Sequence, residues 1–484
     1  MQQSIGKSIM YSSNESLILG SLVVIYFLFL FGVSFYINKK SIKTYDDYNV
    51  AGRSVSIFPL ILTFVGTAVG GATLLGFMQN GFLYGMGQQW LNFAIFISGV
   101  LMLAFFLKKI RAIGEKYQMV TIADYTVLRF GEGARIPTVV SVLVANCALT
   151  GMQFAAIATI LNLTMGLNIT TGILISWVLL TLKTYYGGMK SVIWQDAFHG
   201  TIQTIGIFVL FLTVILASGG LQEVSKQAAL ANQSEFLSIL GISPSEVFVY
   251  LLTIGAYQFL RQDLWQRFWA ASSAKIARNG YWIAVVLGAL TAFMIITIGV
   301  MARFGLNLGE IDSSLTYYIV IGDVFSFPMI VVMIIALLAT VISTADSFCM
   351  AGASSIINDI IKPRLQESTD LDSRLLKYSR LSVLIVSIFS LLLALSIPKL
   401  VGLWVTGAAM LVSSLLAPVI AGLFWKKATR LGGIVAMWVG LIVAVTWQIL
   451  GHPFGLHPIF IGFPISVLLV IFVSLMTSDN SSNI

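Results

Sequence analysis

Apolar runs of similar length recur along the whole chain, and short polar or charged segments separate them. A helix needs about 20 apolar residues to cross the hydrocarbon core of a bilayer. Thirteen runs are long enough, so the pattern predicts thirteen transmembrane helices. We place them at residues 17–37, 56–78, 86–108, 136–163, 168–186, 190–217, 245–268, 276–303, 327–358, 376–397, 399–425, 431–450 and 457–477.

The composition is that of a multi-pass membrane protein. Of the 484 residues, 58% are hydrophobic and 10% are charged, whereas a soluble protein carries about 25% charged residues. The net charge of +8 does not indicate nucleic-acid binding, because the chain has no basic stripe with interleaved aromatic residues. Cys147 and Cys349 both lie in apolar runs, which favours small buried side chains over a disulfide or a metal site. We therefore expect an all-α polytopic protein of the cell membrane.

Basic residues between the runs predict its orientation. Lys39, Lys40 and Lys43 follow the first run, which is too long for a signal peptide, so the N-terminus is expected outside. An odd number of spans then places the C-terminus inside. Most of the 28 Lys and Arg fall on the inner side under this assignment. The four expected outside are Lys7, Lys226, Arg303 and Lys399.

Glycines interrupt two of the predicted spans. The second reads FPLILTFVGTAVGGATLLGFMQNG, and the seventh contains Gly255 followed by a polar tail. Glycines in membrane helices often serve close helix packing. Two interrupted spans that lie five apart, however, are typical of a transporter built from inverted repeats. The glycines of the second span are Gly66, Gly70, Gly71, Gly76 and Gly81.

This spacing suggests a division of the chain. An extra N-terminal helix and inner loop precede two repeats of five helices each, and two helices and a short tail follow them. A polar outer loop, either a small cap or unstructured, separates the repeats. The expected boundaries are 1–55, 56–217, 218–244, 245–425 and 426–484.

Polar residues also occur inside apolar runs. The ninth run contains Ser343, Thr344, Asp346 and Ser347, in VISTADSFCMAG. Hydroxyls in membrane helices can bond back to the carbonyl four residues earlier. An intramembrane carboxylate, in contrast, needs a partner or a cation, and hard oxygen ligands suit hard cations.

A second intramembrane acid, Asp196, lies in the sixth run with His199 three residues later. Asp196 is either an ion ligand or the partner of a nearby hydroxyl. His199 is either a proton-carrying group or a hydrogen-bonded interior side chain.

Six motifs in order resemble those of the sodium:solute symporter family, which includes sodium/glucose, proline, pantothenate, sialic acid and choline transporters. They are DYNVAGRSVS, TIADYTVLRFG, YYGGMKSVIWQD, QDLWQRFWAASSAKIARNG, ATVISTADS and AGLFWKK, and together they cover most of the chain. The resemblance implies a LeuT-type fold of five plus five inverted helices. It also implies sodium-coupled symport of a small solute by alternating access, with Na⁺ as the coupling ion.

The resemblance assigns sodium ligands to positions in this sequence. The conserved site would use backbone carbonyls of Gly66 and Val69 in the second span and of Thr340 in the ninth. The hydroxyls of Ser343 and Thr344 would complete it. A second sodium, held by some members, would use Asp196, Asp346 and Ser347.

The solute pocket is expected at the midplane, between the two breaks. No Lys or Arg is expected at that depth, which disfavours, without excluding, a solute carboxylate. Tyr257 matches an aromatic lid of the sugar-transporting members. The class of solute stays open among sugars, amino acids, carboxylates and quaternary amines. The candidate contacts are Thr73, Gln88, Gln89, Trp90, Asn146, Gln153, Tyr257, Gln258, Trp404 and Thr406.

Other functions are weighed against symport. An enzyme is not expected, because no acid/base or metal set converges near one interface. A proton-coupled or uncoupled carrier would keep the fold, but it would depend on protonation of Asp196, His199 or Asp346 in place of sodium binding. A solute sensor would normally add a soluble domain, and the tail TSDNSSNI is too short for one.

Overall fold

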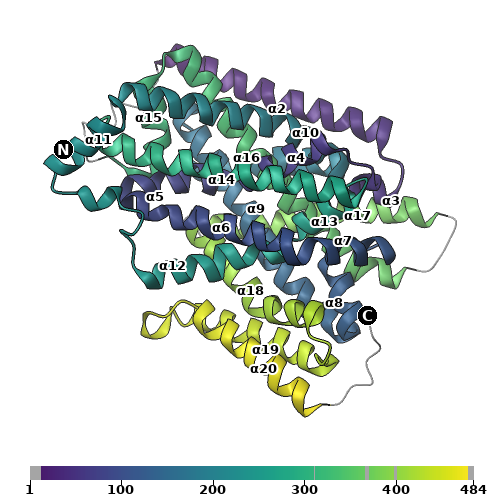
Figure 1. Ribbon diagram of the computed structural model, residues 1–484. Helices are drawn as coiled ribbons and strands as arrows, with labels where there is room; N and C mark the ends of the chain where they lie inside the picture. Colours follow the sequence, from purple (N-terminus) through teal and green to yellow (C-terminus); the bar gives the residue numbers. More distant parts are fainter. Residues whose placement is uncertain (1–11, 310, 366–369, 397–399, 478–484) are drawn as a thin grey trace.

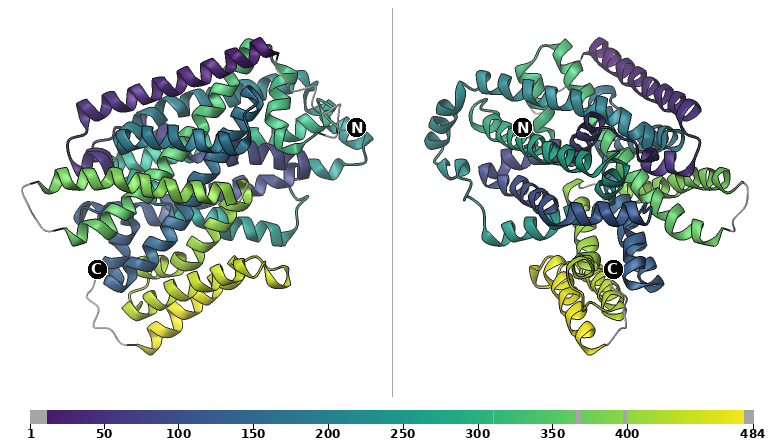
Figure 2. Two further views of the ribbon diagram at one scale, coloured as in Figure 1. Left: turned by 180° about the vertical axis from the view of Figure 1, so that it is seen from behind. Right: turned by 45° about the vertical axis from the view of Figure 1, so that its right-hand side comes forward.

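The computed structural model describes residues 12–309, 311–365, 370–396 and 400–477. Within these ranges the regular secondary structure is helical, and an isolated bridge joins Val55 and Ala271. Helix α2 lies along one edge of the bundle, and α19 and α20 lie along the opposite edge (Figures 1 and 2). Lys7 and Lys399, two of the basic residues used to predict orientation, lie outside the described ranges.

The long helices follow the predicted runs, and several short helices lie between them. Their bounds are α2 Ser13–Ser41, α3 Tyr45–Val50, α4 Ile57–Ala68, α5 Phe77–Tyr84, α6 Gln89–Leu101, α7 Leu107–Lys116, α8 Ile122–Phe130, α9 Arg135–Met165, α10 Ile169–Ala217, α11 Gly220–Leu230, α12 Pro244–Tyr250, α13 Gln262–Ala270, α14 Ala274–Phe304, α15 Thr316–Val324, α16 Phe327–Ser355, α17 Leu371–Ser396, α18 Leu400–Phe424, α19 Arg430–Ile449 and α20 Ile459–Met476.

Ten helical stretches of the described residues are long and apolar enough to cross a membrane. The difference from thirteen has a structural cause at three places. The predicted spans 56–78 and 245–268 are each divided into shorter helical pieces. The predicted spans 168–186 and 190–217 together make up α10, which is bent at Gly188 and is counted once among the ten. The all-helical architecture is confirmed, whereas the count of thirteen and the orientation stay predictions.

A bend divides α10 at Gly188. Its backbone has φ 57° and ψ −176°, a region that is essentially restricted to glycine. A Cβ at this position would lie 2.6 Å from the ring of Tyr48. The bend separates an N-terminal half, which carries Lys183, from a C-terminal half, which carries Asp196.

Helices α4, α9, α10 and α16 form the packed centre of the molecule. Small residues let their backbones approach closely, as expected for helices in a membrane. A Cβ on Gly200 of α10 would lie 2.6 Å from the carbonyl oxygen of Leu62 in α4. This close approach brings the polar side chains of α10 within reach of the break in α4.

The segment 218–244, which is predicted to separate two repeats, is folded. It contains α11 and a helical turn at Ser234–Leu237. Arg303 of α14 donates to the carbonyl oxygen of Phe82 at 3.1 Å and to Oε1 of Gln233 at 3.2 Å. Residues 218–244 are therefore structured, and their role as a cap on the outer side stays a prediction.

Candidate functional site

The break in α4 lies against the polar turn of α16. Helix α4 ends at Ala68, and Val69 leaves helical geometry with φ −109° and ψ 85°. A Cβ on Gly66 would lie 3.0 Å from Oγ of Ser343, and one on Gly70 would lie 2.8 Å from Oγ1 of Thr344. Two glycines therefore allow the backbone of the break to touch the two hydroxyls that the sequence singled out.

One further hydrogen bond lies at the break, and another lies within the facing turn of α16. The backbone N–H of Gly71 donates to Oε1 of Gln153 at 3.1 Å, so a side chain of α9 replaces the missing helical acceptor. Oγ1 of Thr344 donates to the carbonyl oxygen of Thr340 at 3.1 Å. The five residues predicted for the first sodium site are thus gathered at one place, between α4 and α16.

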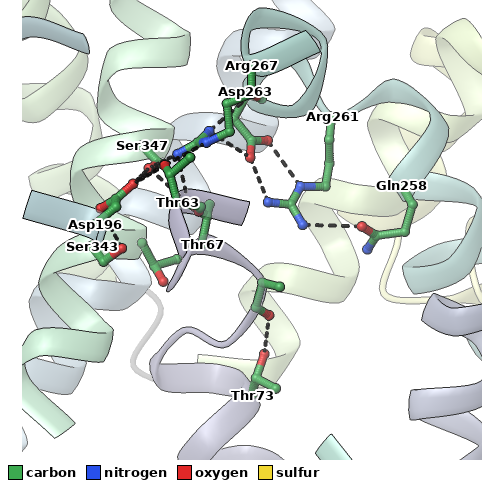
Figure 3. A network of polar contacts seen from close by, with 12 residues as sticks. Thr63, Thr67, Thr73, Asp196, Gln258, Arg261, Asp263, Arg267, Ser343 and Ser347 are labelled. Atoms are coloured by element: carbon green, nitrogen blue, oxygen red, sulfur yellow. Dashed lines mark hydrogen bonds and ion pairs between the residues drawn. The ribbon is translucent and has the colours of Figure 1, made fainter. Parts of the chain in front are cut away.

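The seventh span breaks at Arg261. Its backbone is extended, with φ −65° and ψ 105°, between a short helical turn at Gln258–Leu260 and α13. The guanidinium donates to both carboxylate oxygens of Asp263, at 3.0 and 2.6 Å, and to Oε1 of Gln258 at 3.2 Å. Figure 3 shows this second break beside the first.

A buried ion pair connects the two breaks. Nη2 of Arg267 in α13 lies 3.1 Å from Oδ2 of Asp196 in α10, and both side chains are 0% exposed. The same nitrogen donates to Oγ1 of Thr67 at 2.7 Å and to Oγ of Ser347 at 2.6 Å. Nε donates to Oγ1 of Thr63 at 3.0 Å. One guanidinium therefore joins α4, α10, α13 and α16 (Figure 3).

Asp196 also contacts the hydroxyl of Ser343, which is predicted to belong to the first sodium site. Oγ of Ser343 donates to Oδ1 of Asp196 at 2.6 Å, and Ser347 approaches Oδ2 at 3.4 Å. Ser343 thus stands between the break in α4 and the Asp196–Arg267 pair. Of the alternatives raised for Asp196, pairing with hydroxyls is observed, and the arginine adds to it.

Asp346 lies apart from this network. Its Oδ2 accepts from the ammonium of Lys183, and its Oδ1 accepts from Oγ1 of Thr184 at 2.7 Å. The three residues predicted for a second sodium are therefore not gathered: Asp196 and Ser347 meet, and Asp346 faces the other half of α10. Both carboxylates already have a cation from the protein.

The expectation that no Lys or Arg lies at pocket depth is wrong. Lys183, Arg261 and Arg267 are all buried, between 0% and 6% exposed. Each had a visible signal in the sequence, since each lies within or next to an apolar run. The orientation prediction assigns all three to the inner side, with most of the other basic residues. A sequence cannot show which acid will neutralise a buried base.

His199 is completely buried next to Tyr26, with ring centroids 6.1 Å apart. Among the described residues neither ring nitrogen has a hydrogen-bond partner. The hydrogen-bonded interior histidine that we considered is therefore not what the structure shows.

Two adjoining cavities lie between the breaks. Both are lined by Ala68, Thr73, Ile95, Gln258 and Arg261. One also contains Val69 of the first break, and the other contains Thr344. The cavities therefore touch residues that are predicted for the first sodium site.

Half of the ten predicted solute contacts line these cavities. They are Thr73, Gln153, Tyr257, Gln258 and Trp404.

The other five do not line them. Gln88 accepts from the hydroxyl of Tyr250 near the outer loop, and Gln89 donates to the carbonyl oxygen of Phe293. Trp90 packs edge-on against Phe93, and Asn146 donates to the carbonyl oxygen of Val142. Thr406 is partly buried in α18. Helix packing accounts for the first four.

Polar side chains that we did not predict also line the cavities. Arg261 is the most significant, and Asn92 and Tyr281 accompany it. Asn92 was recognisable as a polar residue three positions after Gln89 on the same helix, whereas Tyr281 depends on how α14 packs.

The comparisons with known proteins agree with this geometry. The model of the sodium:solute symporter family matches residues 48–440. The chain is 25% identical over 457 residues to the high-affinity proline transporter PutP of Bacillus subtilis, covering 92% of this chain and 96% of that protein. It is 24% identical over 464 residues to the sodium/pantothenate symporter of Escherichia coli, covering 92% and 94%.

Solved structures show the same fold. A Na⁺-coupled sialic acid symporter in a substrate-bound outward-open state superposes with a TM-score of 0.79 at 19% identity, covering 95% of this chain and 98% of that one. MhsT in complex with L-phenylalanine gives a TM-score of 0.56 at 15% identity, covering 87% and 99%. The expected LeuT-type fold is thereby confirmed.

Proposed function

The chain belongs to the sodium:solute symporter family, and on that basis we propose that it carries a small carboxylate-bearing solute into the cell together with one Na⁺, by alternating access. It is a multi-pass membrane transporter and not an enzyme. The observation that carries the proposal is the contact of Gly66 and Gly70 with the hydroxyls of Ser343 and Thr344.

The residues at this contact suit a sodium ion. Na⁺ is a hard cation, and carbonyl and hydroxyl oxygens are its matching ligands. In our proposal the carbonyls of Gly66, Val69 and Thr340 and the hydroxyls of Ser343 and Thr344 hold it. Bound there, Na⁺ would add one positive charge next to the neutral Asp196–Arg267 pair, to which Ser343 is hydrogen-bonded.

Coupling follows from where these ligands come from. Helix α4 lies in the proposed first repeat, 56–217, and α16 lies in the proposed second repeat, 245–425. An ion bound to both stabilises the arrangement in which they touch, and it also orders the wall of the cavity, because Val69 and Thr344 belong to that wall. One charge that moves through about 100 mV contributes about 2.3 kcal/mol.

Charge balance supports a carboxylate as the solute group. The buried bases Lys183, Arg261 and Arg267 are matched by the acids Asp346, Asp263 and Asp196. Sodium would add a positive charge to this neutral interior, and a carboxylate next to Arg261 would offset it. Charge-assisted bonds from a guanidinium are well suited to that group.

The relatives point in the same direction. Proline, pantothenate and sialic acid, which are named for the similar proteins, all carry a carboxylate. Arg261 lines both cavities, and Gln258 next to it offers an amide for a second polar group of the solute. We propose amino acids and hydroxy or amido carboxylic acids as the class to screen first.

Thermal unfolding of the purified protein tests the proposal. We expect NaCl to raise the unfolding temperature above that in KCl, because a ligand of the native state stabilises it by mass action. A carboxylate solute should raise it further in NaCl only. Ser343→Ala and Thr344→Ala should each remove most of the sodium effect.

The matched control is Thr340→Val. It keeps the carbonyl proposed as a ligand and loses only the hydroxyl, which donates to the carbonyl oxygen of Ala336. Its sodium effect should persist. An unfolding temperature that is the same in NaCl and KCl for every solute would instead favour a proton-coupled carrier, and solute binding without uptake into vesicles would favour a sensor.

A further inference from the structure

A lysine–aspartate pair lies inside the membrane-spanning bundle, next to the proposed sodium site. Lys183 belongs to the N-terminal half of α10 and Asp346 to the middle of α16, and they are 3% and 1% exposed. The ammonium and the hydroxyl of Thr184 each donate to one oxygen of the carboxylate. Asp346 is therefore both neutralised and hydrogen-bonded by groups of the chain itself.

The pair shares one turn of α16 with the sodium ligands. Asp346 follows Thr344 by two positions, so it points to a different side of the helix from Thr344. Ser343 and Ser347 face Asp196, whose charge Arg267 balances. This turn of α16 thus contains the carboxylate of Asp346 and contacts that of Asp196. Each carboxylate is paired with a basic side chain of another helix.

A mobile cation bound at Asp346 would have to take the position of the Lys183 ammonium and balance the same carboxylate charge. Both are monovalent cations, but the lysine is tethered and cannot follow an ion gradient. Thr181, one turn before Thr184 on α10, has a buried hydroxyl without a hydrogen-bond partner among the described residues. Without the ammonium, the carboxylate of Asp346 and the hydroxyl of Thr184 would border a vacated position of the kind that hard cations occupy, with Thr181 one turn away along α10.

We propose that the Lys183 ammonium is a built-in counter-ion that takes the place of a second sodium at Asp346, and that it limits coupling to one Na⁺ per cycle. The inference rests on the proposed function, since it counts from the sodium at the break in α4. It also makes a strong statement about Lys183: replacing it with a neutral residue of similar length creates a second sodium site.

Equilibrium binding of ²²Na⁺ to the purified protein tests this directly. The wild type should bind one ion per chain. Lys183→Met and Lys183→Gln should bind two, and the second ion should be lost in the double variant Lys183→Met/Asp346→Asn. Lys183→Gln keeps a hydrogen-bond donor for Asp346, so it serves if the methionine variant does not fold.

Lys190→Met is the matched control. Lys190 lies on the same helix and pairs with Asp47 at 3.2 Å, but outside this cluster. It should bind one ion, like the wild type. A wild type that binds two ions, or folded Lys183 variants that bind only one, overturns the inference while leaving sodium coupling intact. A wild type that binds no sodium overturns the proposed function itself.

Discussion

Arg267 and Asp196 form an ion pair with a distance of 3.1 Å between Nη2 and Oδ2, and neither side chain reaches solvent. The two residues are 71 positions apart in the sequence and belong to different helices. Thr63 and Thr67 of α4 bond to the same pair, so the arginine fixes α4, α10 and α13 relative to one another. The ion pair thereby holds α4 in position next to α16, where the break in α4 contacts it.

Removing the arginine should be strongly destabilising. Arg267→Met leaves the carboxylate of Asp196 buried without a cation, and we expect a loss of about 3–5 kcal/mol in the free energy of unfolding. Asp196→Asn added to it should recover part of this loss. Denaturation of the detergent-purified variants measures both.

The control for this prediction is Arg278→Met. Arg278 is an exposed residue of α14 whose hydrogen bond among the described residues is to its neighbour Asn279. Its effect should stay within about 0.5 kcal/mol. If the double variant is no more stable than Arg267→Met alone, the unpaired charge is not the cause of the loss.

A methyl group at Gly70 should separate the break from its hydroxyl. The Cβ of Gly70→Ala would lie 2.8 Å from both Oγ1 and Cγ2 of Thr344, so either the Thr344 side chain or the backbone of the break must shift. We expect a stability loss of about 1–3 kcal/mol from overpacking and a sodium affinity at least tenfold weaker. Titration of the unfolding temperature with NaCl measures the affinity.

Two variants sharpen the Gly70 test. Thr344→Ser added to Gly70→Ala removes the crowded methyl and keeps the hydroxyl, so part of the sodium response should return. Gly32→Ala in α2 meets nothing within 4 Å and should be neutral or slightly stabilising. A full sodium response in Gly70→Ala would argue against the ligand set proposed here.

Arg261 should determine solute affinity without affecting sodium. Arg261→Gln/Asp263→Asn removes the base together with its acid, so the net charge of the interior does not change. We expect a carboxylate solute to bind about 10- to 100-fold more weakly, because a hydrogen bond to a charged group contributes about 1.5–3 kcal/mol. Isothermal titration in NaCl measures this affinity.

Sodium stabilisation should survive in that variant, since neither residue is among the proposed sodium ligands. Arg303→Gln is the control, because Arg303 contacts Phe82 and Gln233 outside the cavities. Unchanged affinity for the carboxylate solute in Arg261→Gln/Asp263→Asn would mean that another donor recognises it.

The bend in α10 should not tolerate a side chain. Gly188→Ala forces a Cβ into backbone geometry with φ 57° and toward the ring of Tyr48. Such strain costs about 1–3 kcal/mol, before the contact with the ring is added. The comparison is Gly322→Ala in α15, where an added Cβ would meet nothing within 4 Å. Denaturation of both variants gives the difference in the free energy of unfolding.

The helical architecture could be predicted from the sequence because it depends on local quantities. A backbone in lipid must satisfy its own hydrogen bonds, so an apolar run of sufficient length has to be a helix. The glycines of the second span likewise marked its break. The prediction that Ser343, Thr344 and the carbonyl of Thr340 are sodium ligands rests on the family resemblance of a motif that is continuous in the sequence. These residues indeed lie together, because helical spacing placed them within one turn of α16.

Only the tertiary structure decided how the charges pair. Lys183 and Asp346 are 163 positions apart, and nothing local distinguishes a carboxylate that awaits a mobile cation from one that is already neutralised. The same holds for Asp196 with Arg267, and for Arg261 at the cavity. Electrostatic pairing in a low-dielectric interior depends on distance in space, so it emerges only when α4, α10, α13 and α16 are packed together.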